Sequence, residues 1–168
     1  MEDVNFLRSV ALFVEFEAAE LADLRKFFHS TRFAGGDVIL EEGKANRALH
    51  IVKGGRVRVS RVSEDGEIAL CDLSEGQTFG ELSVIEDGFA SATIAAVGPC
   101  EVWSIPVNDL ATYLKEKPAA AAKFWRQIAI DLRRRLIQTN DVVRTYFSMN
   151  RALASNPKFR EAYAMCNR

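Results

Sequence analysis

The stretch FGELSVIEDGFASAT, residues 79–93, combines residue types that could bind an anion through the protein backbone. It opens with an aromatic residue, a glycine and an acid, and it closes with the small residues Ala90, Ser91, Ala92 and Thr93. Small residues let a backbone approach a ligand closely and point its N–H groups at it. No lysine or arginine lies within the stretch, so the cation that would pair with such an anion must come from elsewhere.

The remaining reactive residues give little support to catalysis or metal binding. His29 and His50 fall in different predicted elements, whereas a metalloenzyme of a barrel fold needs several histidines and a carboxylate at one metal. Neither a Ser/His/Asp set nor a Cys/His set is evident. The three cysteines, Cys71, Cys100 and Cys166, are widely spaced, which is typical of buried thiols in a reducing compartment. We therefore expect no enzymatic activity and no metal.

Composition indicates an ordinary folded protein without a broad surface for nucleic acid. The chain has 168 residues, of which 48% are apolar and 27% charged, and its net charge is -1. The N-terminal MEDVNFL lacks the basic and apolar regions of a signal peptide, and no apolar run approaches the roughly 18 residues of a membrane span. We expect a cytoplasmic protein with no membrane contact and no direct DNA binding.

The elements that must position residues 79–93 follow from hydrophobic periodicity and glycine spacing. Residues 1–32 favour one or two short helices, and residues 33–105 alternate strand-length runs such as GRVRVSRV and EIALCDL with glycines. The SEDGE segment between Ser63 and Glu67 indicates a hairpin turn. Strands at this spacing are typical of a sandwich or barrel. Residues 106–147 predict helices, and residues 148–168 form a tail.

The predicted helix after Pro118 is longer than a small barrel needs for its own cover. About 30 residues would span about 45 Å. One stripe suggests a homodimer through this helix, although both of its apolar stripes could instead pack on the parent domain. The stripe comprises Trp125, Ile128, Leu132, Leu136, Thr139, Val143 and Phe147.

Residues 5–147 resemble the cyclic nucleotide-binding domain of the catabolite activator protein and the cyclic-nucleotide-regulated kinases. The resemblance lies in FAGGDVILEEG, LHIVKGGRVRVSR, DGEIALCDLSEGQTFGELSVIEDG and SATIAAV, in this order. It implies an antiparallel β-roll of about eight strands, a jelly-roll-like double-stranded β-helix, with short N-terminal helices and a long C-terminal helix. It also implies that residues 79–93 are the family's phosphate-binding cassette.

For the cassette, the resemblance implies that Glu81 accepts a hydrogen bond from the ribose 2′-hydroxyl and that the amides of Gly80, Leu82 and Ser91 cap the cyclic phosphate. Ala90 stands where the family has a phosphate-pairing arginine. A charge-assisted hydrogen bond contributes roughly 1.5–3 kcal/mol, so its loss would weaken binding by roughly one to two orders of magnitude. Arginine at position 90 should therefore strengthen binding.

For the base, the resemblance implies a pocket lined from the barrel by Leu70, Cys71 and Leu73 and closed by the long helix. On that helix it implies Arg135 near the acid of the cassette, with Thr139 and Asn140 at the adenine edge. The expected function is a sensor of a cyclic nucleotide, cAMP in the first place, that passes its state to a downstream protein through the helix. The alternative is a dimerisation or interaction scaffold that has lost nucleotide binding, which Ala90 favours.

Overall fold

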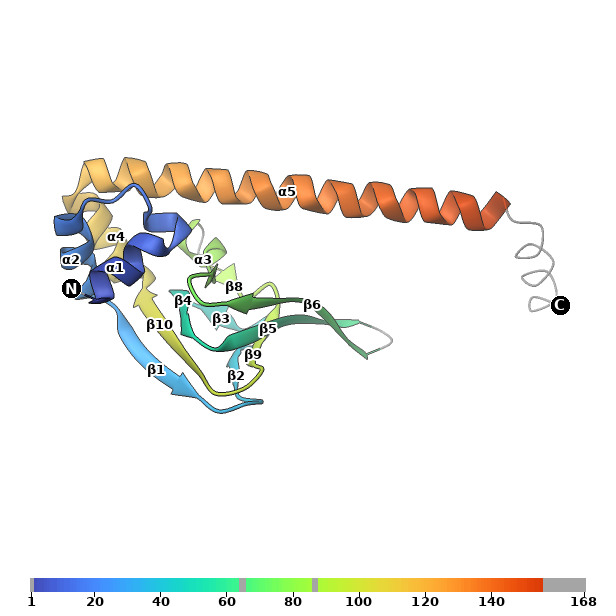
Figure 1. Cartoon of the computed structure of the whole chain (residues 1–168), viewed down its shortest axis with the longest axis horizontal. Helices are drawn as coiled ribbons and strands as arrows, with labels where there is room; N and C mark the ends of the chain where they lie inside the picture. Colours follow the sequence, from blue (N-terminus) through green and yellow to red (C-terminus); the bar gives the residue numbers. More distant parts are fainter. Residues whose placement is uncertain (1, 64–65, 86–87, 156–168) are drawn as a thin grey trace. The chain divides into compact units, whose positions relative to one another are not determined.

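The computed structural model describes residues 2–63, 66–85 and 88–155. The chain divides into two compact units, Met1–Ile128 and Ala129–Arg168. The first unit contains all the strands, the short helices and the first turns of the last helix (Figure 1). The second unit begins within that helix.

The strands of the first unit form the antiparallel β-roll that the sequence predicts. In one four-stranded sheet the order is β1 (His29–Phe33), β10 (Cys100–Pro106), β4 (Ala48–Gly54) and β7 (Thr78–Phe79). In the other it is β2 (Val38–Leu40), β9 (Thr93–Ala96), β5 (Arg56–Ser63) and β6 (Gly66–Ser74). A short ribbon pairs β3 (Ala45–Asn46) with β8 (Gly88–Phe89).

The hairpin of β5 and β6 follows the alternation in its sequence. Val57 is fully buried, whereas Arg58 lies on the outer face and its Nε is 2.9 Å from Oδ1 of Asp72 on β6. The two strands end with Ser63 opposite Gly66, on either side of the predicted turn. Residues 64 and 65 of that turn lie outside the described residues.

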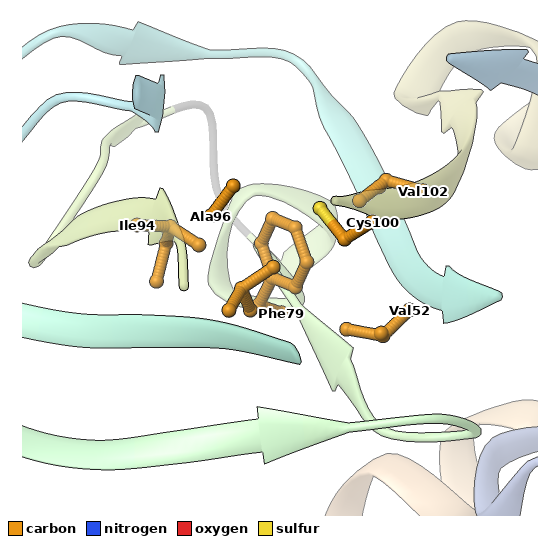
Figure 2. Packing of buried hydrophobic residues seen from close by; sticks show 7 residues of the cluster. Val52, Phe79, Ile94, Ala96, Cys100 and Val102 are labelled. Atoms are coloured by element: carbon orange, nitrogen blue, oxygen red, sulfur yellow. The ribbon is translucent and has the colours of Figure 1, made fainter. Parts of the chain in front are cut away.

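A cluster of buried side chains joins the strands around Phe79, the first residue of the FGE motif. Figure 2 shows Val52, Ile94, Ala96 and Cys100 around the Phe79 ring, from strands that are far apart in the sequence. Burying a side chain of this size contributes about 1.5–3 kcal/mol. The motif is therefore anchored in the core at its first residue.

The helices of the first unit pack together at one end of the roll. Apart from α3 of the cassette, they are α1 (Glu2–Ser9), the 3-10 helix η1 (Ala11–Phe13), α2 (Ala18–Arg25), α4 (Val107–Glu116) and the start of α5 (Pro118–Ser155). A capping box between Glu17 and Glu20 starts α2. The ring of Phe13 stacks on Phe124 of α5 at 6.1 Å, and Tyr113 donates a hydrogen bond to the carbonyl of Glu20.

The buried face of α5 in the first unit differs from the stripes expected from the sequence. Ala120, Phe124 and Ile128 are buried at steps of four residues, so Ile128 of the predicted stripe shares its buried face with Phe124, which lies outside that stripe. Trp125, expected in the same stripe as Ile128, is 43% exposed. The reason is that successive residues are about 100° apart around a helix, so Trp125 lies about 100° from Phe124, the middle residue of the buried row.

Two element bounds differ from the segment limits expected from the sequence. The first strand begins at His29 because it pairs with β10 over its whole length, although its polar side chains show no strand alternation. Helix α5 extends to Ser155, past residue 147. The second unit consists, in its described part, of this helix, which has exposed apolar side chains. These are Leu136, Ile137, Val142, Val143, Tyr146, Phe147 and Met149.

Candidate functional site

The cassette begins in the core and turns sharply at Gly80. Phe79 ends β7 and is 4% exposed, Gly80 has φ +78, and helix α3 (Leu82–Ile85) follows at once. Residues 86 and 87 lie outside the described residues, and β8 then leads to the small residues. The left-handed conformation at Gly80 suits glycine because side chains with a Cβ rarely adopt it.

Space as well as conformation requires glycine at position 80. A Cβ there would lie 2.6 Å from Nδ2 of Asn46, 2.8 Å from the carbonyl oxygen of Ala48 and 3.1 Å from Cδ2 of His50. The carbonyl belongs to the backbone of a paired strand and cannot move aside easily. The turn therefore presses directly against the residues that precede and begin β4.

Those residues form a buried polar network beneath the cassette. Nδ2 of Asn46 donates to the carbonyl of Ala48 at 2.9 Å and to Oγ of Ser83 on α3 at 3.1 Å. Nε2 of His50 lies 3.2 Å from Oδ1 of Asn46, and the His50 ring stacks on Phe79 at 4.8 Å. Because Asn46 is 5% and Ser83 5% exposed, these bonds fix α3 against the ribbon of β3 and β8.

His50 is neutral in this network. Burial lowers the pKa of His50 from 6.5 to about 4. Since Oδ1 of Asn46 can only accept, the ring carries its proton on Nε2, and Nδ1 has no hydrogen-bond partner among the described residues. The ring therefore packs on Phe79 and orients Asn46.

Glu81 lies on the buried side of the same turn. It is 3% exposed, and its carbonyl accepts from the amide of Val84 at 3.1 Å, while the amide of Ser83 donates to the carbonyl of Gly80 at 3.2 Å. The backbone bonds close the first turn of α3. An acid is thus held next to the tight turn, in the place where the sequence predicts the ribose-binding carboxylate.

The small-residue end of the cassette is joined to the connection between β2 and β3. The amide of Ala90 donates to the carbonyl of Lys44 at 2.7 Å, and the amide of Gly43 donates to the carbonyl of Ala90 at 2.9 Å. Oγ1 of Thr93 accepts from the amide of Glu42 at 3.1 Å. Ala90 is half-buried and Ser91 exposed. The end of the cassette is therefore part of a ribbon and not a free loop.

The other predicted site residues lie in several settings. Leu70 is 56% and Leu82 47% exposed, whereas Leu73 is partly buried against the core cluster. The second unit contains Arg135, whose Nε is 2.9 Å from Oδ2 of Asp131, and the exposed residues Thr139 and Asn140. The structure places Gly80 and Glu81 in one turn, with Ala90 and Ser91 on the adjoining ribbon. The ligand-binding roles of the ten residues expected from the sequence stay predictions.

Sequence reasoning missed Asn46 and Ser83, because no local pattern connects them. They are 37 positions apart and meet only through the closure of the roll. Within the described residues, no group of three or more His, Cys, Asp or Glu side chains could hold a metal ion. None of the described helices combines the length and the apolar character that crossing a membrane requires.

Comparison with known proteins adds a family match and similar structures. The profile described as cyclic nucleotide-binding domain matches residues 30–117. A cyclic nucleotide-gated channel of Caenorhabditis elegans is 34% identical over 120 residues, 68% of this chain and 16% of that protein. The chain covers 16–20% of the length of the curated relatives that it matches.

Two solved structures show the same fold. The N-terminal domain of a transcriptional regulator from Streptomyces coelicolor has a TM-score of 0.70 and 31% identity, with 82% of this chain and 94% of that chain covered. The catabolite activator protein of Thermus thermophilus has a TM-score of 0.69 and 26% identity, with 79% and 63% covered.

Proposed function

Since the chain belongs to the cyclic nucleotide-binding domain family and is a regulatory module of that kind, we propose that its first unit binds cyclic AMP and signals through α5. The observation that carries this proposal is the turn of the cassette. Glu81 is buried beside Gly80, and the hydrogen bonds of Asn46 with Ser83 and His50 hold the turn against β3 and β4. A preformed turn costs less to organise when a ligand binds.

In this proposal each part of the ligand meets a different part of the cassette. The carboxylate of Glu81 accepts a hydrogen bond from the ribose hydroxyl. The amides of Gly80, Leu82 and Ser91 donate to the cyclic phosphate, and Ala90 lies beside it on the ribbon. Leu70 and Leu73 face the base from β6. Arg135, Thr139 and Asn140 of α5 are the further ligand contacts in this proposal, and through them a bound ligand would act on the helix.

The output of the proposed switch is the position of α5. A helix of 38 residues with exposed apolar side chains needs a surface to cover them, and a second copy of the chain is the simplest one. We propose a homodimer through this helix, read by a downstream protein. The chain would act in the cytoplasm as a non-enzymatic module. Cys100 is buried, as the sequence predicts, whereas Cys71 is exposed, and a free thiol at an exposed position is typical of a reducing compartment.

A second candidate function is a dimerisation scaffold that binds no nucleotide. Ala90 favours it, because the cassette has no arginine to pair with a phosphate. The exposed apolar residues of α5 serve this function equally well. In the first function the carboxylate of Glu81 binds the ribose, whereas in a scaffold it would only cap the local turn, so nucleotide titration distinguishes the two.

Calorimetric titration of the chain with cyclic AMP and with cyclic GMP tests the proposal. We expect saturable binding that Glu81→Gln weakens by roughly ten- to a hundredfold, the effect of a hydrogen bond to a charged group. Glu75→Gln is the matched control, because Glu75 is exposed on the turn after β6. If neither nucleotide produces heat or raises the melting temperature, the scaffold is the better description.

A further inference from the structure

The connection that leads into β3 carries a β-bulge opposite Ala90. Gly43 has φ +77, its amide donates to the carbonyl of Ala90, and the amide of Ala90 donates to the carbonyl of Lys44. Two residues, Gly43 and Lys44, thus oppose one residue, which is the glycine type of bulge. The amide of Lys44 also donates to the carbonyl of Glu41 at 3.0 Å and closes the preceding turn. Lys44 therefore occupies the paired position across from Ala90.

Strand alternation decides which face of the ribbon Lys44 is on. Ala45 is opposite Phe89, and both are exposed, with Phe89 at 72%. Asn46 is opposite Gly88 and is buried toward Ser83 of α3. Because alternate side chains share a face, Lys44 lies on the face of Asn46 and Ala90, toward the cassette turn. Directly opposite Cβ atoms are about 5 Å apart, well within the length of a lysine side chain.

The charged neighbours of Lys44 on β5 and in the turn are engaged with each other. The carboxylate of Glu42 accepts from Nε of Arg61 at 2.8 Å and from the amide of Val62 at 3.1 Å. Lys44 is exposed, and its ammonium group has no ion pair among the described residues. The backbone carbonyl of Lys44 accepts a hydrogen bond from the amide of Ala90, the residue that stands where the family has an arginine.

We propose that Lys44 supplies the positive charge of the cassette and binds the anionic cyclic phosphate from the strand opposite Ala90. The inference rests on the proposed function, since it names a binding residue of the same site. A lysine ammonium is a mobile point charge and binds phosphate with less geometric control than an arginine fork. The site would therefore keep a charged contact with the phosphate, supplied by the connection that leads into β3 instead of by position 90.

Titration of the full chain with cyclic AMP and cyclic GMP tests this inference. We expect Lys44→Ala and Lys44→Gln to weaken binding about tenfold, the scale of one charge-assisted hydrogen bond, and Lys44→Arg to restore most of the affinity. Lys115→Ala is the control, because Lys115 is exposed on α4. Raising the KCl concentration should weaken parent binding more than Lys44→Ala binding, because only the parent has the screened charge pair.

A second measurement uses Ala90→Arg in two backgrounds. If Lys44 already neutralises the phosphate, Ala90→Arg should improve binding by tenfold or more in the Lys44→Ala background and by clearly less in the parent. Equal gains, or Lys44→Ala binding as tightly as Lys115→Ala, would refute the role of Lys44 and leave nucleotide binding intact. A parent that binds neither nucleotide would overturn the proposed function together with this inference.

Discussion

Replacing Gly80 with alanine tests whether the close approach beneath the cassette stabilises the protein. Two costs can be separated. An alanine at φ +78 is strained by roughly 1–2 kcal/mol. Its Cβ would also stand 2.8 Å from the backbone carbonyl of Ala48 and 2.6 Å from Nδ2 of Asn46, so the Asn46 side chain must leave its hydrogen bonds. Leaving buried polar groups unsatisfied costs about 1–3 kcal/mol.

The structure offers a matched control for the first cost. Gly76 has φ +80, and a Cβ there would meet nothing within 4 Å. Gly76→Ala should therefore lower the free energy of unfolding by the conformational cost alone. Gly80→Ala should lower it by about 1–3 kcal/mol more, which is roughly 3–10 °C in melting temperature for a domain of this size.

Urea and thermal unfolding of the parent and both variants, followed by circular dichroism, provide the measurement. Nucleotide affinity measured in parallel should fall in Gly80→Ala and stay near the parent value in Gly76→Ala. Equal destabilisation by the two substitutions would refute the reasoning. It would mean that Asn46 and the carbonyl of Ala48 move aside at no cost, so that the network beneath the turn adds no rigidity.

Three further predictions concern pH, assembly and DNA. Because the folded-state pKa of His50 is lowered from 6.5 to about 4, its neutral form stabilises the fold fully above the unfolded pKa. About 3 kcal/mol of the free energy of unfolding should be lost as pH falls from 6.5 to about 4. Denaturant titration should show a weaker loss in His50→Phe, and equal pH dependence would contradict it. Leu132→Glu with Val143→Glu should convert a dimer to a monomer in light scattering at micromolar concentration, and a monomeric parent would end the idea. Gel-shift assays at physiological salt should show no discrimination among duplex sequences by this chain of net charge -1, and a sequence-dependent shift would be the contrary result.

Local pattern was enough to predict several of the strands and a sandwich or barrel, and the family resemblance narrowed this to a β-roll. The alternation around Val57 and the SEDGE turn match a hairpin of β5 and β6 in which Ser63 pairs with Gly66. The helix after Pro118 was equally evident from its three- and four-residue steps. Such signals are readable because the period of side chains along a strand or helix is a property of the backbone itself. The FGEL motif and its small residues predicted the candidate site.

Tertiary structure decided which residues support that site. Asn46, His50 and Ser83 come from β3, β4 and α3, and only the closed roll brings them under Gly80. Strand β1 is polar and exposed, so its pairing with β10 gives no local signal. Lys44 lies opposite Ala90 because a bulge at a left-handed glycine sets the register of the ribbon. Register depends on hydrogen bonds between segments more than forty residues apart, and no periodicity within either segment encodes it.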